Sequence, residues 1–141
     1  MTERQSVALA LAMMMIGCVM AAKSDELTGQ ATLKIFSGRP NPTWLLSPTE
    51  TQHLRDRISA LSARLPKPPE VPDLGYRGVH IAMPGVEFTV GYGGIAVEEA
   101  GKTTNFVDAG RQVERWLLNT AQGKISPDVL KIAEAGIGAP P

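Results

Sequence analysis

Apolar and polar residues alternate in several short stretches of the chain, and this period of two is typical of half-buried β-strands. The first alternating stretch starts at Ala31 and includes Leu33, and the pattern recurs over residues 79–83, 86–90 and 95–97. Glycine or proline turns separate these stretches. Residues 103–107 are expected to return as a further strand.

A spacing of three and four residues predicts the first helix. Ser47 and Glu50 form a capping box, and Pro48 occupies the first helical position. The apolar residues that follow share one face and are Leu54, Ile58, Leu61 and Leu65. The helix is therefore expected to stop by Leu65, because Pro66 follows.

Two more helices are expected near the C-terminal end of the chain. Asp108 is a suitable cap for a helix over about 109–121, which Gly123 ends. A short third helix begins at Ser126 and ends at Gly136. Both carry an apolar stripe that can pack against a sheet.

Two proline-rich segments separate the predicted elements. Residues 39–44 (RPNPTW) contain two prolines that fix φ and remove backbone donors, so no regular structure is expected there. Residues 66–74 (PKPPEVPDL) contain four prolines and predict an extended, polyproline-like connector. The resulting order is β-α-β-β-β-α-α, which predicts an α+β fold: a small antiparallel sheet with two to three helices packed on one face. Residues 31–138 are expected to form one such domain.

The N-terminal region has the layout of an export signal. Residues 1–5 are polar, residues 6–17 are almost wholly apolar, and Cys18 is the only cysteine. Met15-Ile16-Gly17-Cys18 resembles the lipobox of bacterial lipoproteins. That resemblance implies a signal peptide over 1–17, lipidation of Cys18, and a tether over 18–30 that holds the protein on a membrane.

Two alternatives to lipidation stay open. Val19-Met20-Ala21 also fits a small-x-small site, so ordinary cleavage after Ala21 or Ala22 would give a soluble periplasmic or secreted protein. The apolar run over residues 6–22 is close to the length of about 20 that spans a membrane, which would make it an uncleaved anchor. Lipidation and both alternatives predict that the protein is exported. If the lipobox resemblance holds, the absence of aspartate after Cys18 implies an outer-membrane lipoprotein that faces the periplasm.

Charge and cysteine content exclude several function classes. Lys and Arg together number 14, as do Asp and Glu, which argues against a nucleic-acid partner. One cysteine cannot form a disulfide framework. A mature domain of this size buries roughly two-thirds of the surface of its unfolded chain, so it needs no metal or disulfide to fold.

No residue pattern in the chain indicates catalysis, a metal or a cofactor. His53 and His80 are the only histidines, and zinc needs three or four ligands. Glu98 and Glu99 are adjacent on a predicted strand, so they point to opposite faces. No nucleophile elbow or phosphate loop is present. A non-enzymatic domain is therefore favoured, with an enzyme of unrecognised type using His53 or His80 as the alternative.

Two rigid loops hold the candidate binding residues, which are Arg39, Asn41, Trp44, Tyr76 and Arg77. Arginine offers a planar fork of donors for anions, and aromatic side chains offer flat apolar faces. If the loops meet, they could bind a small anion or a sugar. The competing interpretation is structural: the arginines join loop groups together and the aromatic rings fill the edge of the core.

Three segments, FSGRPNPTW, GYRG and ERWLL, resemble a family of small bacterial proteins with no characterised activity. The resemblance transfers no catalytic residue. Two functions therefore stand beside the enzyme alternative. One is an envelope lipoprotein that binds a protein or another envelope component. The other is a periplasmic domain that binds a small anionic or sugar ligand.

Overall fold

The computed structural model describes residues 28–138. The expected signal peptide, Cys18 and most of the expected tether lie outside the described residues. Gly29 is already part of the folded domain, because its buried N–H donates to Thr51 Oγ1 over 3.1 Å.

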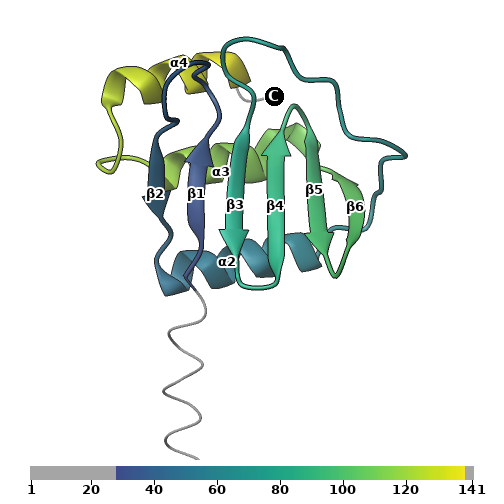
Figure 1. Ribbon diagram of the computed structural model, residues 1–141. Coiled ribbons are helices and arrows are strands. Elements are labelled where there is room, and N and C mark those ends of the chain that lie inside the picture. The colour runs from purple at the N-terminus through teal and green to yellow at the C-terminus, as the bar shows by residue number, and fades with distance from the viewer. Residues whose placement is uncertain (1–27, 139–141) are drawn as a thin grey trace, which may run out of the picture.

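The centre of the fold is a six-stranded antiparallel sheet in the order β2-β1-β3-β4-β5-β6 (Figure 1). The last four strands form a meander of consecutive hairpins, and β1 pairs with both β2 and β3. The strand bounds are β1 Gln30–Leu33, β2 Thr43–Leu45, β3 Val79–Met83, β4 Val86–Gly91, β5 Gly94–Glu99 and β6 Lys102–Val107.

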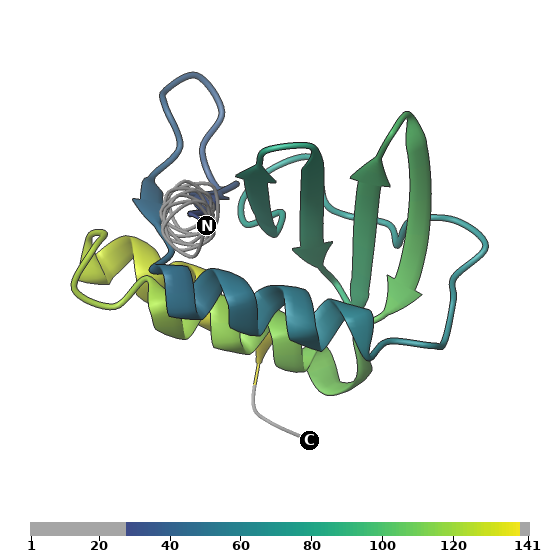
Figure 2. The same ribbon diagram turned by 90° about the horizontal axis from the view of Figure 1, so that it is seen from below.

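Three α-helices cover one face of this sheet, as Figure 2 shows. They are α2 Pro48–Ser59, α3 Gln112–Thr120 and α4 Pro127–Ile137, and the 3₁₀ turn η1 Ala109–Arg111 precedes α3. The core lies between the helices and the inward side chains of the strands, including the fully buried Leu33, Ile81 and Val90. The predicted α+β class, with helices on one face, is therefore confirmed.

The opposite face of the sheet, which we call the open face, has no helix over it in the described part of the chain (Figures 1 and 2). Cross-strand partners share a face, so the register places Thr32, His80, Thr89 and Ala96 in one row there. The residues between them, such as Ile81 and Val90, point into the core.

The first helix is shorter than its apolar spacing predicted. It ends at Ser59 and not at Leu65. Ala63 O then accepts from Val107 N over 2.8 Å, and Leu65 N donates to Asn105 O over 2.9 Å. The chain leaves the helix because this extended segment satisfies backbone groups of the edge strand β6.

The expectation of an irregular loop over residues 39–44 was wrong at its C-terminal end, where Thr43 and Trp44 form part of β2. The two prolines precede the strand, so no ladder donor is lost from it. Trp44 pairs with Ala31 and is buried against the helices. The strand expected over residues 103–107 is β6, which pairs with β5, so β2 is the one strand of the sheet that the sequence pattern did not predict.

Candidate functional site

The two arginine loops meet at one end of the sheet. Arg77 donates from Nη2 to Phe36 O over 2.7 Å, and its backbone N–H donates to Lys34 O over 2.7 Å. Lys34 N in turn donates to Gly78 O over 2.9 Å. Two residues, Arg77 and Gly78, thus stand opposite the single residue Lys34, and this arrangement is a β-bulge. A bulge changes the direction in which nearby side chains point.

Asn41 and Trp44 are engaged inside the protein. Asn41 Oδ1 accepts from the backbone N–H groups of Ile35 and Phe36 over 3.0 and 2.8 Å. Trp44 is only 4% exposed, and its Nε1 donates to Thr120 Oγ1 over 3.0 Å. Both residues therefore hold the first loop in place, and Trp44 presents no polar atom to solvent in this arrangement.

Tyr76 belongs to a buried polar cluster. Its hydroxyl donates to Glu114 Oε2, and Glu114 also accepts two bonds from Arg111, from Nε over 2.7 Å and from Nη2 over 2.8 Å. The Arg111 guanidinium lies over the Tyr92 ring, 4.8 Å from the ring centre. The Tyr92 hydroxyl donates to Tyr76 O. Sequence reasoning did not find this cluster, since a glutamate in the first turn of a helix is ordinarily a solvated residue that favours the helix dipole.

The electrostatics of the cluster follow from its burial. Desolvation raises the pKa of Tyr76, and the charge of Glu114 beside it raises the pKa further. Burial also raises the pKa of Asp108, against two backbone N–H bonds from Val113 and Glu114 that lower it. Glu114 has no exposed surface, so it cannot touch a dissolved molecule. The cluster therefore joins α3 to the loop before β3.

Arg39 is the most exposed member of the predicted set. Its guanidinium lies 3.6 Å from the centre of the Phe36 ring, a cation–π contact. Both side chains border an open hollow that also involves Lys124, but Lys124 already donates to Leu45 O and pairs with Glu50 at 3.3 Å. The hollow therefore has only Arg39 to offer an anion.

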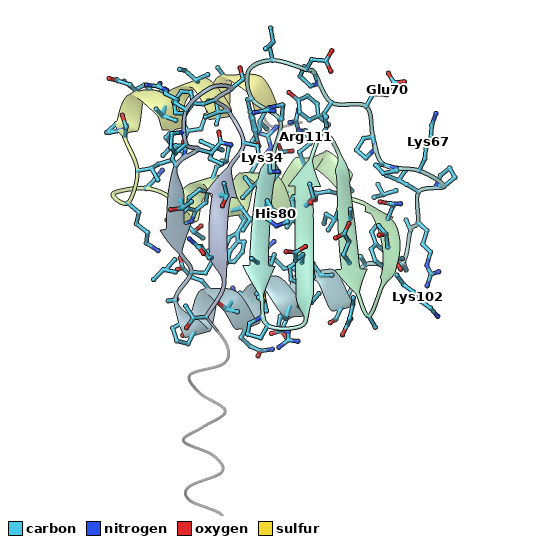
Figure 3. All side chains as sticks on the ribbon, in the orientation of Figure 1. Lys34, Lys67, Glu70, His80, Lys102 and Arg111 are labelled. Atoms are coloured by element: carbon cyan, nitrogen blue, oxygen red, sulfur yellow. The ribbon has the colours of Figure 1, made fainter. Side chains whose placement is uncertain are left out.

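A better enclosed cavity of about 320 Å³ lies on the open face. Its floor is formed by Thr89, Gly91, Gly94 and Ala96 of strands β4 and β5. The proline connector, residues 66–74, supplies its wall through Pro68, Pro69 and Val71. Lys34 and Arg77 complete the lining, and Figure 3 shows Lys34 at the upper end of the open face. We call this space the open-face cavity.

The charges around the open-face cavity are of one sign. None of the described residues that line it carries a carboxylate, and its two charged groups are the side chains of Lys34 and Arg77. Lys34 is exposed and makes no side-chain hydrogen bond or ion pair within residues 28–138. Arg77 Nε is buried and finds no acceptor in the same range. Both cations therefore retain donors that an anion could use.

The two histidines lie apart from each other, and His80 borders the open-face cavity through its contact with Thr89. His53 is exposed on α2, with its ring 6.2 Å from that of Trp116. On the open face, His80 Nδ1 is 3.3 Å from Thr89 Oγ1, and its Nε2 is 3.7 Å from Glu87 Oε1, which is beyond hydrogen-bond distance. Within the described part of the chain, no three His, Cys, Asp or Glu side chains are placed to share a metal ion.

No known protein-family model, no curated protein and no solved structure matches this chain. Among the helices of residues 28–138, none combines the length and the apolar character that crossing a membrane requires.

Proposed function

We propose that this protein is a non-enzymatic binding domain of the cell envelope, which a lipid on Cys18 holds at a membrane. The observation that carries the proposal is the open-face cavity, where a proline-stiffened segment stands beside a bare part of the sheet and two cations keep unused donors. A pre-ordered cavity with few polar groups is typical of ligand sites.

The composition of the cavity favours binding over catalysis. General acid–base catalysis needs a group that can take up or release a proton near neutral pH, within about 3 Å of its substrate or partner. The described lining offers a lysine, an arginine and a threonine hydroxyl, with no histidine or carboxylate among its members. Lys34 and Arg77 can orient an anion, and His80 stands outside the lining, in contact with the Thr89 hydroxyl.

The place where the domain begins suits attachment to a membrane. The strand β1 starts at Gln30, at the lower end of the sheet in Figure 1, and Lys34 follows the upper end of the same strand. A tether ahead of Gln30 would therefore hold the domain by the end opposite the open-face cavity. The cavity would then face away from the membrane and stay accessible to solutes.

The tether is tested by labelling cells with an alkyne fatty acid. Wild-type protein should carry the label and sediment with membranes, whereas Cys18→Ser should lose both properties. Substituting serine removes only the thiol, so export through an ordinary signal would be retained. If neither form is labelled and the mature chain begins at Ala22 or Lys23, the lipid anchor is wrong and the domain is a soluble exported protein.

A further inference from the structure

We infer that the open-face cavity binds a small organic carboxylate with a flat apolar body. This inference rests on the proposed binding function and names the class of ligand. It follows from three features of the cavity: a low floor, a charge of one sign, and a prepositioned arginine.

The floor is low because two of its residues, Gly91 of β4 and Gly94 of β5, have no side chain. Gly91 pairs with Gly94, and Gly78 approaches Gly91 closely enough that a Cβ on Gly91 would lie 3.0 Å from Gly78 Cα. Ala96 is the next residue on the open face of β5. The Pro69 ring and Gly78 already pack against Gly94 and Gly91, where a Cβ would lie 2.7 and 3.0 Å from them. The space left for a planar ring therefore lies over Ala96, beside Thr89 and the rings of Pro68 and Pro69.

The charge selects a carboxylate over a sugar. A sugar presents many hydroxyl groups that need acceptors as well as donors, and the described lining offers a single side-chain hydroxyl, that of Thr89. Lys34 and Arg77 are donors only. The acidic side chains Glu87 and Glu98 border a different hollow, beside the turns at Gly85 and Gly101. Glu70 lies on the connector and points away from the strands in Figure 3.

Arg77 is held ready for a planar anion. Its backbone is fixed by the bulge opposite Lys34, and its Nη2 is anchored to Phe36 O. Fixing one nitrogen in this way orients the rest of the guanidinium fork, so little side-chain freedom is lost when a carboxylate binds. The size of the cavity, about 320 Å³, is near the lower limit for ligand pockets and suits a ligand of one ring.

The test titrates the full chain, purified in detergent and labelled with ¹⁵N, with benzoate. We expect saturable shifts of the amide signals of Gly91, Gly94 and Ala96, and weaker binding as salt is raised. Benzamide keeps the ring without the charge, and inorganic phosphate keeps the charge without the ring. Each should bind at least tenfold more weakly than benzoate.

Two variants locate the binding. Lys34→Gln removes an exposed cation without touching the core and should weaken benzoate binding several-fold, whereas the control Lys102→Gln, at the far end of β6, should leave it unchanged. Ala96→Leu fills the floor and should abolish binding while the Arg77–Phe36 contact remains. Circular dichroism checks that each variant is folded.

The outcomes separate the ligand class from the binding function. If benzamide binds at these glycines as tightly as benzoate, the cavity is a ligand site but the carboxylate is wrong. If phosphate matches benzoate, the flat apolar body is wrong. If no probe shifts these signals, or if Ala96→Leu binds benzoate as wild type does, the cavity is not the site and both proposals for it fail.

Discussion

At Arg111 the chain adopts a left-handed backbone, with φ of 54°, and places a guanidinium against a carboxylate that has no exposed surface. A non-glycine residue in this region costs about 1 kcal/mol or more. The two hydrogen bonds to Glu114 offset that cost. The Glu114 carboxylate can be buried because Arg111 and Tyr76 together donate hydrogen bonds to it. Each partner is needed, since losing one would leave the buried charge incompletely paired.

Replacing Arg111 with alanine should therefore destabilise the fold strongly. Arg111→Ala leaves Glu114 buried with only the Tyr76 hydroxyl as partner, and breaking a buried ion pair in this way costs about 3 kcal/mol or more. Urea denaturation measures the loss. Arg55→Ala, on the exposed side of α2, is the matched control and should change the free energy of unfolding by less than about 0.5 kcal/mol. Equal losses for the two variants would contradict the structural role of the pair.

Tyr76 should make the stability of the domain sensitive to alkaline pH. Burial raises its pKa in the folded state above the value of about 10 that it has when unfolded. Its contribution is thus fully present below pH 10 and is lost as the pH rises further, by about 1.4 kcal/mol per pH unit. The Tyr76→Phe variant has no hydroxyl to titrate, so it lacks this pH-dependent contribution to the free energy of unfolding.

Unfolding midpoints of wild type and Tyr76→Phe at several pH values test the expectation. The wild type should be the more stable protein at pH 8, because the hydroxyl bonds a charged group, worth about 1.5 kcal/mol or more. The difference should shrink above pH 10. A difference that stays constant to pH 11 would show that Tyr76 titrates alike in both states.

Among the elements, those whose signals are local were predicted from the sequence. The capping box forms as expected, with Glu50 N donating to Ser47 Oγ and Ser47 N donating to Glu50 Oε1. The alternating stretches from β3 to β6 are strands, since each hairpin partner follows within a few residues. These signals need no knowledge of distant contacts.

The errors arose where a distant partner decides the local structure. The end of α2 depends on Ala63 and Leu65 bonding β6, about 40 residues further along the chain. The Tyr76–Glu114 bond spans 38 residues, and nothing local distinguishes a buried glutamate from a solvated one. Of the candidate residues, the structure places Arg77 beside the cavity. Lys34 was not predicted as a binding residue, because a lysine in an alternating stretch ordinarily points to solvent.

Gly94 determines where the proline connector can lie. A Cβ at this position would be 2.7 Å from two ring carbons of Pro69 and 3.2 Å from Leu65 Cδ1. Gly94→Ala should therefore displace the connector, at a cost of about 1–3 kcal/mol, while the strand itself accepts alanine.

The displacement should expose the connector to proteolysis. A glutamate-specific protease should cut after Glu70 several-fold faster in Gly94→Ala than in wild type. Gly136→Ala is the control, since its Cβ would make only ordinary contacts with the Tyr76 ring, at 3.6 Å or more. Unchanged cleavage in Gly94→Ala would mean that Pro69 does not rest on this glycine in solution.

At the scale of the whole molecule, the proposed tether and the open-face cavity lie at opposite ends of the sheet. The chain enters the domain at Gly29 and Gln30, where Gly29 O also accepts from Leu46 N over 2.8 Å, and the open-face cavity lies beyond the other end of β1. Within residues 28–138 the sheet and its three helices share one core. A lipid tether ahead of this domain would thus serve for attachment and leave folding to the domain itself.

Two truncations test this separation of anchoring from folding. A protein that begins at Thr28 should melt within about 2 °C of the full chain. One that begins at Thr32 loses both Gly29 bonds and the fully buried Ala31, about 3 kcal/mol in total, and its melting temperature should fall by roughly 10 °C or more. Thermal circular dichroism of the pair gives the comparison. If the protein that begins at Thr28 melts as low as the shorter one, residues ahead of it contribute to the fold and the tether is not merely an attachment.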